Sequence, residues 1–169
     1  TTLTRGKTAV RVGIIGQGAI GRELAAAIRE GRVGAARLSS VLVRRPASAR
    51  DAGPEGTTDP AHFLAAGLDL VIECAGHAAV RDHAARILEA GIALMVTSAG
   101  AFADEDLWCR CQEAAARHGG RLILPSAGVG ALDALAAAAC GGLDDVSIVV
   151  RKAPDAWAGT PAESAVDLG

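Results

Sequence analysis

The sequence predicts an α/β fold, a parallel sheet doubly wound with helices, and three observations support this. Half of the 169 residues are apolar, which is enough for one buried core of ordinary domain size. Short apolar strand patterns alternate with helix patterns along most of the chain. The first strand pattern runs directly into the glycine-rich turn GQGAIG at residues 16–21, which opens a helix. Alternation of this kind is typical of parallel sheets with right-handed crossovers.

The predicted elements follow one another in a regular order. Short β-branched and apolar runs predict strands at residues 9–15, 38–43, 68–74, 92–97 and 121–124. Apolar residues at helical spacing predict helices at residues 19–30, 60–66, 78–90, 104–118 and 130–140. Residues 47–59 are rich in glycine, proline and polar residues, so we expect a loop there, open to a short helix or a brief edge strand near Thr57.

The C-terminal part of the sequence differs from the rest. A strand pattern at residues 146–150 is followed by the polar, proline-containing residues 151–169. We therefore expect one complete domain over residues 1–140 and the incomplete start of a second, α+β domain over residues 141–169. Too few residues remain for another core.

The turn at residues 16–21 matches G-x-G-x-x-G between a strand and a helix. The first glycine allows a tight turn, the second lets backbone approach a pyrophosphate, and the third lets helix and strand pack closely. The helix N-terminus adds N–H donors. A tight turn without a ligand is the weaker alternative. The motif therefore predicts a Rossmann domain that binds NAD or NADP through Gly16, Gln17, Gly18, Ala19, Ile20 and Gly21.

The second strand lacks the acidic residue that usually binds the adenosine ribose of NAD. It ends instead in Arg44 and Arg45, which could bind a 2′-phosphate in bidentate geometry. Two solvated arginines at a strand end are the alternative. The pair favours NADP acceptance and leaves NAD open.

Two further loops follow predicted strands: Cys74, Ala75, Gly76 and His77 in one, and Ser98 and Ala99 in the other. Ligands of open α/β sheets bind at the carboxyl ends of strands, so we expect both loops to border the nicotinamide ribose or the substrate. His77 could act as an acid or base, although hydrogen bonding at a helix start is favoured. Glu73, which ends a buried strand, needs donors from backbone or ribose.

Composition and charge exclude several classes of binding partner. The formal charge of −2 without a run of Lys or Arg argues against nucleic acid and anionic membranes. The apolar stretches are too short for a membrane span and no signal peptide opens the chain. The four cysteines lack zinc spacing, and neither a metal site nor disulfides are expected. We expect a cytoplasmic protein with a small-molecule substrate.

Five segments together resemble bacterial L-aspartate dehydrogenases, over nearly the whole chain. The segments are IGQGAIG (15–21), VIECAGHAAV (71–80), TSAGAFADEDL (97–107), LPSAGVGALDAL (124–135) and RKAPDAWAGTPAESAVDL (151–168). The resemblance implies reversible, NAD(P)-dependent oxidation of L-aspartate through iminoaspartate to oxaloacetate and ammonia. It also implies a homodimer and a role in NAD biosynthesis.

The resemblance also assigns residues. Gly128, where the family more often has alanine, would contact the cofactor through its backbone. The family's catalytic histidine and a cofactor-contacting asparagine are expected beyond Gly169, so the catalytic residues stay unknown. Two alternatives remain open: another two-domain enzyme of the homoserine dehydrogenase or dihydrodipicolinate reductase type, and a stand-alone NAD(P)-binding redox-sensing module.

Overall fold

The computed structural model describes residues 9–126, 132–147, 149 and 151. The chain divides into two compact units, residues 1–128 and 129–169. The assignment of two domains with a boundary after residue 140 remains a prediction. None of the helices in the described ranges is long and apolar enough to cross a membrane.

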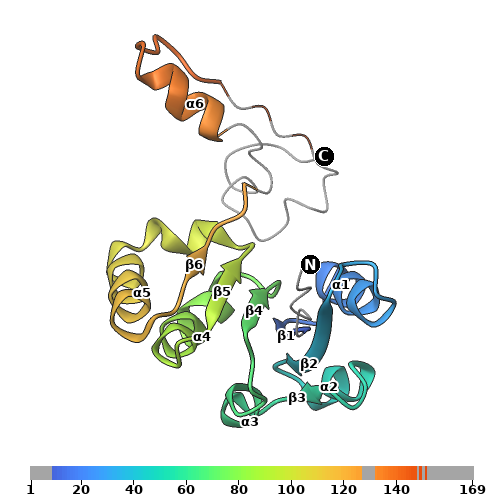
Figure 1. Cartoon of the computed structure of the whole chain (residues 1–169). Coiled ribbons are helices and arrows are strands. Elements are labelled where there is room, and N and C mark those ends of the chain that lie inside the picture. Colours follow the sequence, from blue (N-terminus) through green and yellow to red (C-terminus); the bar gives the residue numbers. More distant parts are fainter. Residues whose placement is uncertain (1–8, 127–131, 148, 150, 152–169) are drawn as a thin grey trace, which may run out of the picture. The chain divides into compact units, whose positions relative to one another are not determined.

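Six parallel strands form the sheet of the first unit, in the order β3-β2-β1-β4-β5-β6 (Figure 1). The strand order reverses between β1 and β4, and such a switch point leaves a crevice at the carboxyl ends of the two strands. The predicted doubly wound parallel sheet is confirmed. The strands are β1 (Val10–Ile15), β2 (Ala36–Leu42), β3 (Gly56–Thr57), β4 (Leu70–Glu73), β5 (Ala93–Val96) and β6 (Leu122–Ile123).

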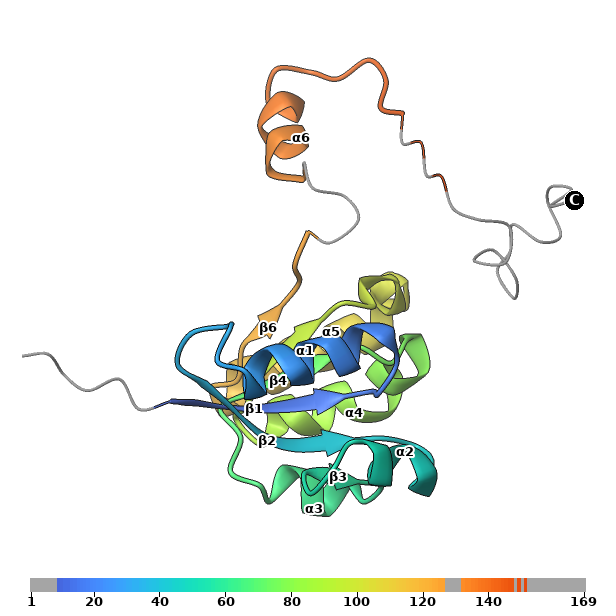
Figure 2. The same cartoon turned by 90° about the vertical axis from the view of Figure 1, so that its right-hand side faces the viewer.

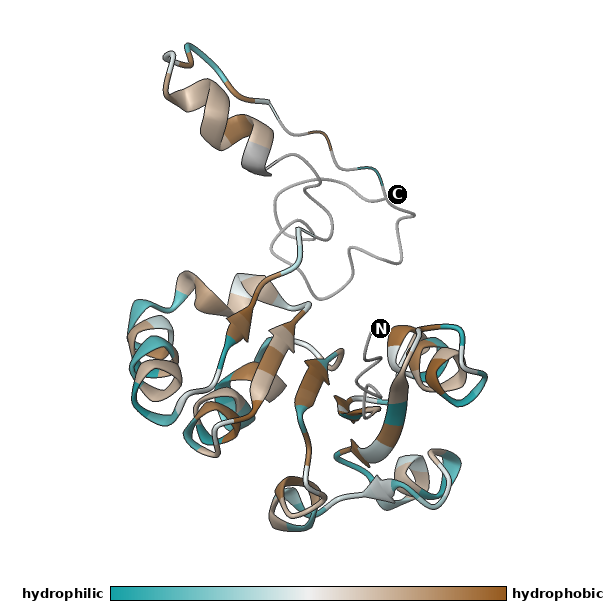
Figure 3. Ribbon diagram, viewed as in Figure 1, coloured by the Kyte–Doolittle hydropathy of each residue, from teal (hydrophilic) through white to brown (hydrophobic). Residues whose placement is uncertain are grey.

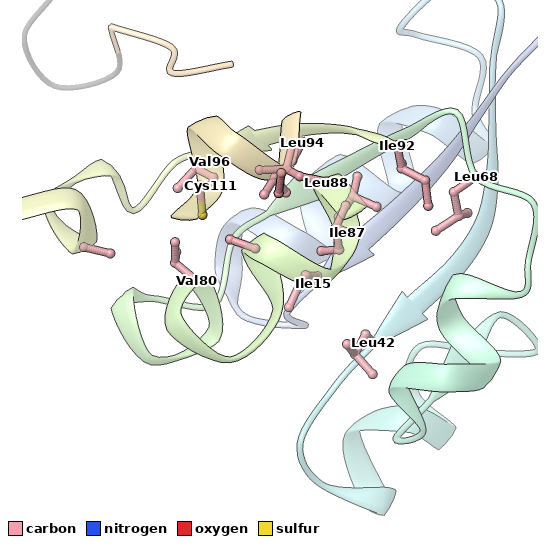
Figure 4. Packing of buried hydrophobic residues seen from close by; sticks show 14 of the residues in the cluster. Ile15, Leu42, Leu68, Val80, Ile87, Leu88, Ile92, Leu94, Val96 and Cys111 are labelled. Carbon is pink, nitrogen blue, oxygen red and sulfur yellow. The ribbon is translucent and has the colours of Figure 1, made fainter. Parts of the chain in front are cut away.

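Helices cover both faces of this sheet (Figure 2). One buried cluster joins α1 and α2 to the first face and includes Ile14, Ile28 and Ala52. A second cluster joins α3, α4 and α5 to the other face (Figure 4). The helices are α1 (Ala19–Arg29), α2 (Pro46–Asp51), α3 (Pro60–Leu64), α4 (His77–Glu89) and α5 (Glu105–His118), with a 3₁₀ helix, η1 (Ala99–Ala103), before α5.

Strand β1 shows how the two clusters share the sheet. Val12 and Ile14 belong to the first cluster and Ile15 to the second, as the alternation of side chains along a strand requires. A Cβ added at Gly13 would lie only 2.7 Å from Cζ of Phe63. Gly13 therefore makes room for the largest buried ring of the core. Figure 3 shows the apolar residues along the strands and the hydrophilic ones mainly on the outer parts of the helices.

Three segments show where the sequence-based prediction was open, right or wrong. Residues 47–59 hold both a helix, α2, and an edge strand, β3, which pairs with β2. The helix α6 (Leu132–Ala139) of the second unit matches the helix expected at 130–140. The prediction of a strand at residues 146–150 is wrong for the residues that the structure describes there. Val146, Ser147 and Val149 belong to no strand. Strands need a hydrogen-bonded partner, and no described strand pairs with them.

Candidate cofactor site

A cavity of about 610 Å³ lies at the carboxyl ends of β1, β2 and β4. Its walls come from the turn after β1, the residues after β2, the loop after β4 and the following part of α4. These segments are distant in sequence, and the reversal of strand order brings them together. The cavity therefore occupies the place where open α/β sheets bind their ligands.

The three glycines of the turn after β1 have different surroundings. Gly16 has φ +105°, and an added Cβ would lie 2.8 Å from the Cys74 carbonyl oxygen. A Cβ added at Gly21 would overlap the carbonyl oxygen of Gly16, whereas one at Gly18 would have no atom within 4 Å. Gly18 is also the N-cap of α1 and supplies no capping side chain. The backbone at Gly18 thus faces open space beside a helix N-terminus, a cradle that fits a pyrophosphate.

Three arginines bring positive charge to the wall of the cavity. Arg22, Arg44 and Arg45 line it and are exposed. None of the ion pairs found among the described residues involves these three side chains. Asp82 of α4 also lines the cavity, so the electrostatic field there is not purely positive. The arrangement can receive a phosphate on the β2 side.

Glu73, at the end of β4, is buried and binds the two loops that follow β4 and β5. Its Oε1 accepts hydrogen bonds from the N–H groups of Ala75 (2.6 Å) and Gly76 (2.7 Å) and from the Ser98 hydroxyl (3.0 Å). Its Oε2 accepts one from the Ser98 N–H (3.1 Å). Four donors satisfy a carboxylate that is only 1% exposed, as a buried charge requires.

Two titratable side chains in the cavity wall have shifted pKa values. Burial, together with the charge of Glu73, raises the pKa of Cys74 to about 11, so its thiol is protonated at neutral pH. Burial also lowers the pKa of His83 on α4, with Asp82 opposing and Arg86 adding to the shift. Both shifts favour the neutral form of the side chain. Among the described residues, no cluster of His, Cys, Asp and Glu could hold a metal ion.

The structure brings about half of the sequence-predicted site residues into the cavity wall. Those that line it are Gly16, Gln17, Gly18, Arg44, Arg45, Cys74 and Ala75. Ala19, Ile20 and Gly21 form the first turn of α1 outside the lining. Gly76, His77, Ser98 and Ala99 lie in the loops after β4 and β5, or just beyond, also outside it. Gly128 lies outside the described residues.

His77 begins α4 and is exposed. A Cβ added at Gly100 would lie 2.9 Å from Nε2 of His77, so the imidazole sits against the backbone of η1. It lies at the helix start as expected, but α4 has no side-chain capping hydrogen bond, so the hydrogen-bonding role of His77 stays a prediction. The described structure gives it no acid–base partner.

Sequence reasoning missed five polar residues of the wall: Arg22, Ser48, Thr58, Asp82 and His83. Three of them carried a detectable signal. The N–H of Arg22 donates to the carbonyl oxygen of Gly18 at 3.0 Å, one helical turn earlier. Asp82 and His83 lie one turn beyond Ala78 and Ala79, which also line the cavity. Helical periodicity extended from the two loops would have placed these three residues on the cavity side.

The fold and the cavity together are those of a dinucleotide-binding domain of the Rossmann type. The family model described as the NAD-binding domain of homoserine dehydrogenase matches residues 16–125. The chain belongs to this family of NAD-binding domains, and it is similar in sequence to bacterial L-aspartate dehydrogenases.

Two of these relatives illustrate the similarity. L-aspartate dehydrogenase of Cupriavidus necator is 50% identical over 100 residues, which cover 59% of this chain and 38% of the relative. That of Ruegeria pomeroyi is 40% identical over 162 residues, covering 94% of this chain and 57% of the relative. The predicted family resemblance is confirmed. The chain spans less than two thirds of the length of these relatives.

Solved structures show the same fold at low sequence identity. Aspartate dehydrogenase of Thermotoga maritima superposes with a TM-score of 0.55 at 22% identity, covering 88% of this chain and 66% of that one. The WlbA dehydrogenase of Bordetella pertussis, in complex with NADH and UDP-GlcNAcA, gives a TM-score of 0.61 at 20% identity. The match covers 70% of this chain and 38% of that one.

Proposed function

We propose that the chain is the cofactor-binding part of an NAD(P)-dependent L-aspartate dehydrogenase. The reaction removes a hydride and a proton from L-aspartate to give iminoaspartate and NAD(P)H, and water then releases oxaloacetate and ammonia. The observation that carries the proposal is the 50% identity over 100 residues to an L-aspartate dehydrogenase. The glycine turn and the cavity in front of it support the same assignment.

Each wall of the cavity has its own part in binding. The turn at Gly18 and the N-terminus of α1 receive the pyrophosphate. The loop at Cys74 and Ala75 borders the nicotinamide end, because it follows β4 across the switch point. The bound cofactor supplies the hydride acceptor. The protonated thiol of Cys74 is not suited to act as a base, and we assign no catalytic residue within this chain.

We expect the cavity to prefer NADP and also to accept NAD. Arg44 and Arg45 follow β2, where the adenosine ribose lies in this fold. Ser48 of α2 and Arg22 of α1 line the same cavity and add hydrogen-bond donors to its wall. Asp82 is the one carboxylate among the described residues of the lining, and it can accept a hydrogen bond from a ribose hydroxyl of NAD.

From the family resemblance we further propose a homodimer and a supply of iminoaspartate for NAD biosynthesis, and from the short apolar stretches of the sequence a cytoplasmic location. All four cysteines are free, which suits a reducing compartment. Size-exclusion chromatography with light scattering tests the dimer directly.

A titration of the chain with NADPH and NADH, followed by nicotinamide fluorescence, tests cofactor binding. Binding that Gly18→Val abolishes supports the dinucleotide site, since the valine side chain enters the open space at Gly18. A folded wild-type chain that binds neither cofactor contradicts the proposal.

The family model favours a second candidate, a dehydrogenase of the homoserine type. Both candidates use the same cofactor domain and differ in the substrate. Reduction of NADP⁺ or NAD⁺ by the complete protein with L-aspartate, compared with L-homoserine, separates the two. Turnover of L-homoserine alone would replace the first candidate.

A further inference from the structure

The buried carboxylate of Glu73 lies where the strand order reverses, and the loops after two strands converge on it. It accepts hydrogen bonds from Ala75 and Gly76 in the loop after β4, and from Ser98 after β5. The Glu73 main-chain oxygen also accepts a hydrogen bond from the Thr97 hydroxyl at 2.9 Å. One residue thus holds both loops on the β4 and β5 side of the switch point.

The same carboxylate acts on the shape of the cavity through its neighbours. Cys74 and Ala75 line the cavity, and they meet the glycine turn where a Cβ added at Gly16 would lie 2.8 Å from the Cys74 carbonyl oxygen and 2.9 Å from the Ala75 Cβ. No described salt bridge pairs Glu73 with a cation. Among the described residues, only these four hydrogen bonds offset the free-energy cost of burying the carboxylate. The geometry of both loops therefore depends on them.

We propose that Glu73 is a positioning residue that fixes the nicotinamide end of the cofactor cavity by holding the loops after β4 and β5 together. The inference rests on the proposed dinucleotide function. Glu73 acts through Ala75, Gly76 and Ser98 and does not itself line the cavity. The adenosine end, at Arg44 and Arg45, is built by the residues after β2 and is independent of these hydrogen bonds.

The separation between the two ends gives a test that general destabilisation cannot imitate. Glu73→Gln keeps the size of the side chain but turns one acceptor oxygen into an NH₂ group that faces donors. We expect the Kd for NADPH to rise about tenfold, as for the loss of a hydrogen bond to a charged group, and the Kd for 2′,5′-ADP, which lacks the nicotinamide, to stay within about twofold.

Two variants complete the design. Ser98→Ala removes one of the four hydrogen bonds and leaves the Ser98 N–H in place, so the Kd for NADPH should rise about threefold. Glu89→Gln makes the same chemical change at the exposed end of α4 and should alter neither Kd. If Glu73→Gln does not fold, Ser98→Ala alone decides the matter.

The outcomes distinguish this inference from the proposed function. The positioning role is supported if each folded variant, Glu73→Gln or Ser98→Ala, loses affinity for NADPH and keeps its affinity for 2′,5′-ADP. Unchanged NADPH affinity, or an equal loss for both ligands, overturns it while leaving the dinucleotide site intact. If the folded wild-type chain binds neither ligand, the proposed function fails, and this inference fails with it.

Discussion

Gly21 in the first turn of α1 lies against the main chain of Gly16, so closely that an added Cβ at Gly21 would overlap the Gly16 carbonyl oxygen. Gly18, between them, faces open space on the cavity side. The three glycines of one motif thus meet different demands. Gly21 allows the helix to pack on the turn, and Gly18 leaves the approach to the backbone free.

Alanine substitutions should separate these two demands. Gly21→Ala should lower the free energy of unfolding by about 1–3 kcal/mol, because the turn must shift to admit the methyl group. Gly18→Ala should cost less than about 1 kcal/mol, but it should weaken NADPH binding about tenfold or more because its Cβ enters the space for the pyrophosphate. Urea denaturation and fluorescence titration measure the two effects. Equal losses of stability in both variants would contradict this assignment.

The arginines after β2 should control the preference for NADPH over NADH. Arg44→Ala or Arg45→Ala should each weaken NADPH binding about tenfold by removing a charge-assisted hydrogen bond, with little effect on NADH. Arg50→Ala is a matched control, because Arg50 is exposed on α2 but does not line the cavity. An equal loss of affinity for both cofactors would place the arginines away from the 2′-phosphate.

Cys74 should react slowly with alkylating reagents. Because its pKa is raised to about 11, the reactive thiolate is scarce at pH 8, and the rate with iodoacetamide should rise up to about pH 11. Exposed Cys109 provides an internal comparison. Bound cofactor should slow the labelling of Cys74 further, since this side chain lines the cavity. Mass spectrometry of the labelled peptides measures both rates, and labelling of Cys74 as fast as Cys109 at pH 8 would refute the shift.

A pair of charged residues should make stability depend on pH in the acid range. Nε and Nη2 of Arg11 in β1 donate to Asp69, at 3.0 and 2.8 Å. These hydrogen bonds, together with one from the main-chain N–H of Arg11 at 2.8 Å, lower the pKa of Asp69 from 3.8 to about 2. A depressed pKa in the folded state stabilises the protein above pH 3.8, and this contribution is lost as the pH falls towards 2.

Asp69→Asn should abolish that part of the pH dependence. The difference in unfolding free energy between wild type and variant should be constant above pH 5 and should shrink between pH 4 and pH 2. High salt should reduce this difference, because the two side chains are 46% and 44% exposed. Denaturation curves across this pH range provide the measurement. If the unfolding free energies of the two proteins change in parallel down to pH 2, the prediction for Asp69 is wrong.

The sequence by itself determined the local elements and the chemistry of the turn. β-Branched runs and helical spacing depend on neighbouring residues only, so β1, α1, β4, α4 and β5 are all predicted within a few residues of their observed bounds. The same holds for the glycine turn, since the spacing of Gly16, Gly18 and Gly21 is itself the signal. Family resemblance added the enzyme class that composition alone could not supply.

Only the tertiary structure decided the strand order and what faces the cavity. The two-residue strand β3 exists because Gly56 and Thr57 pair with Val41 and Leu42 of β2, and its own sequence gives no strong signal. The sequence left open whether Glu73 binds backbone or ribose. The structure brings Ser98 to it from a separate loop, because β4 and β5 end side by side in the sheet. Contacts between residues far apart in sequence depend on how strands pair and helices pack, and local patterns restrict that choice without specifying the individual contacts.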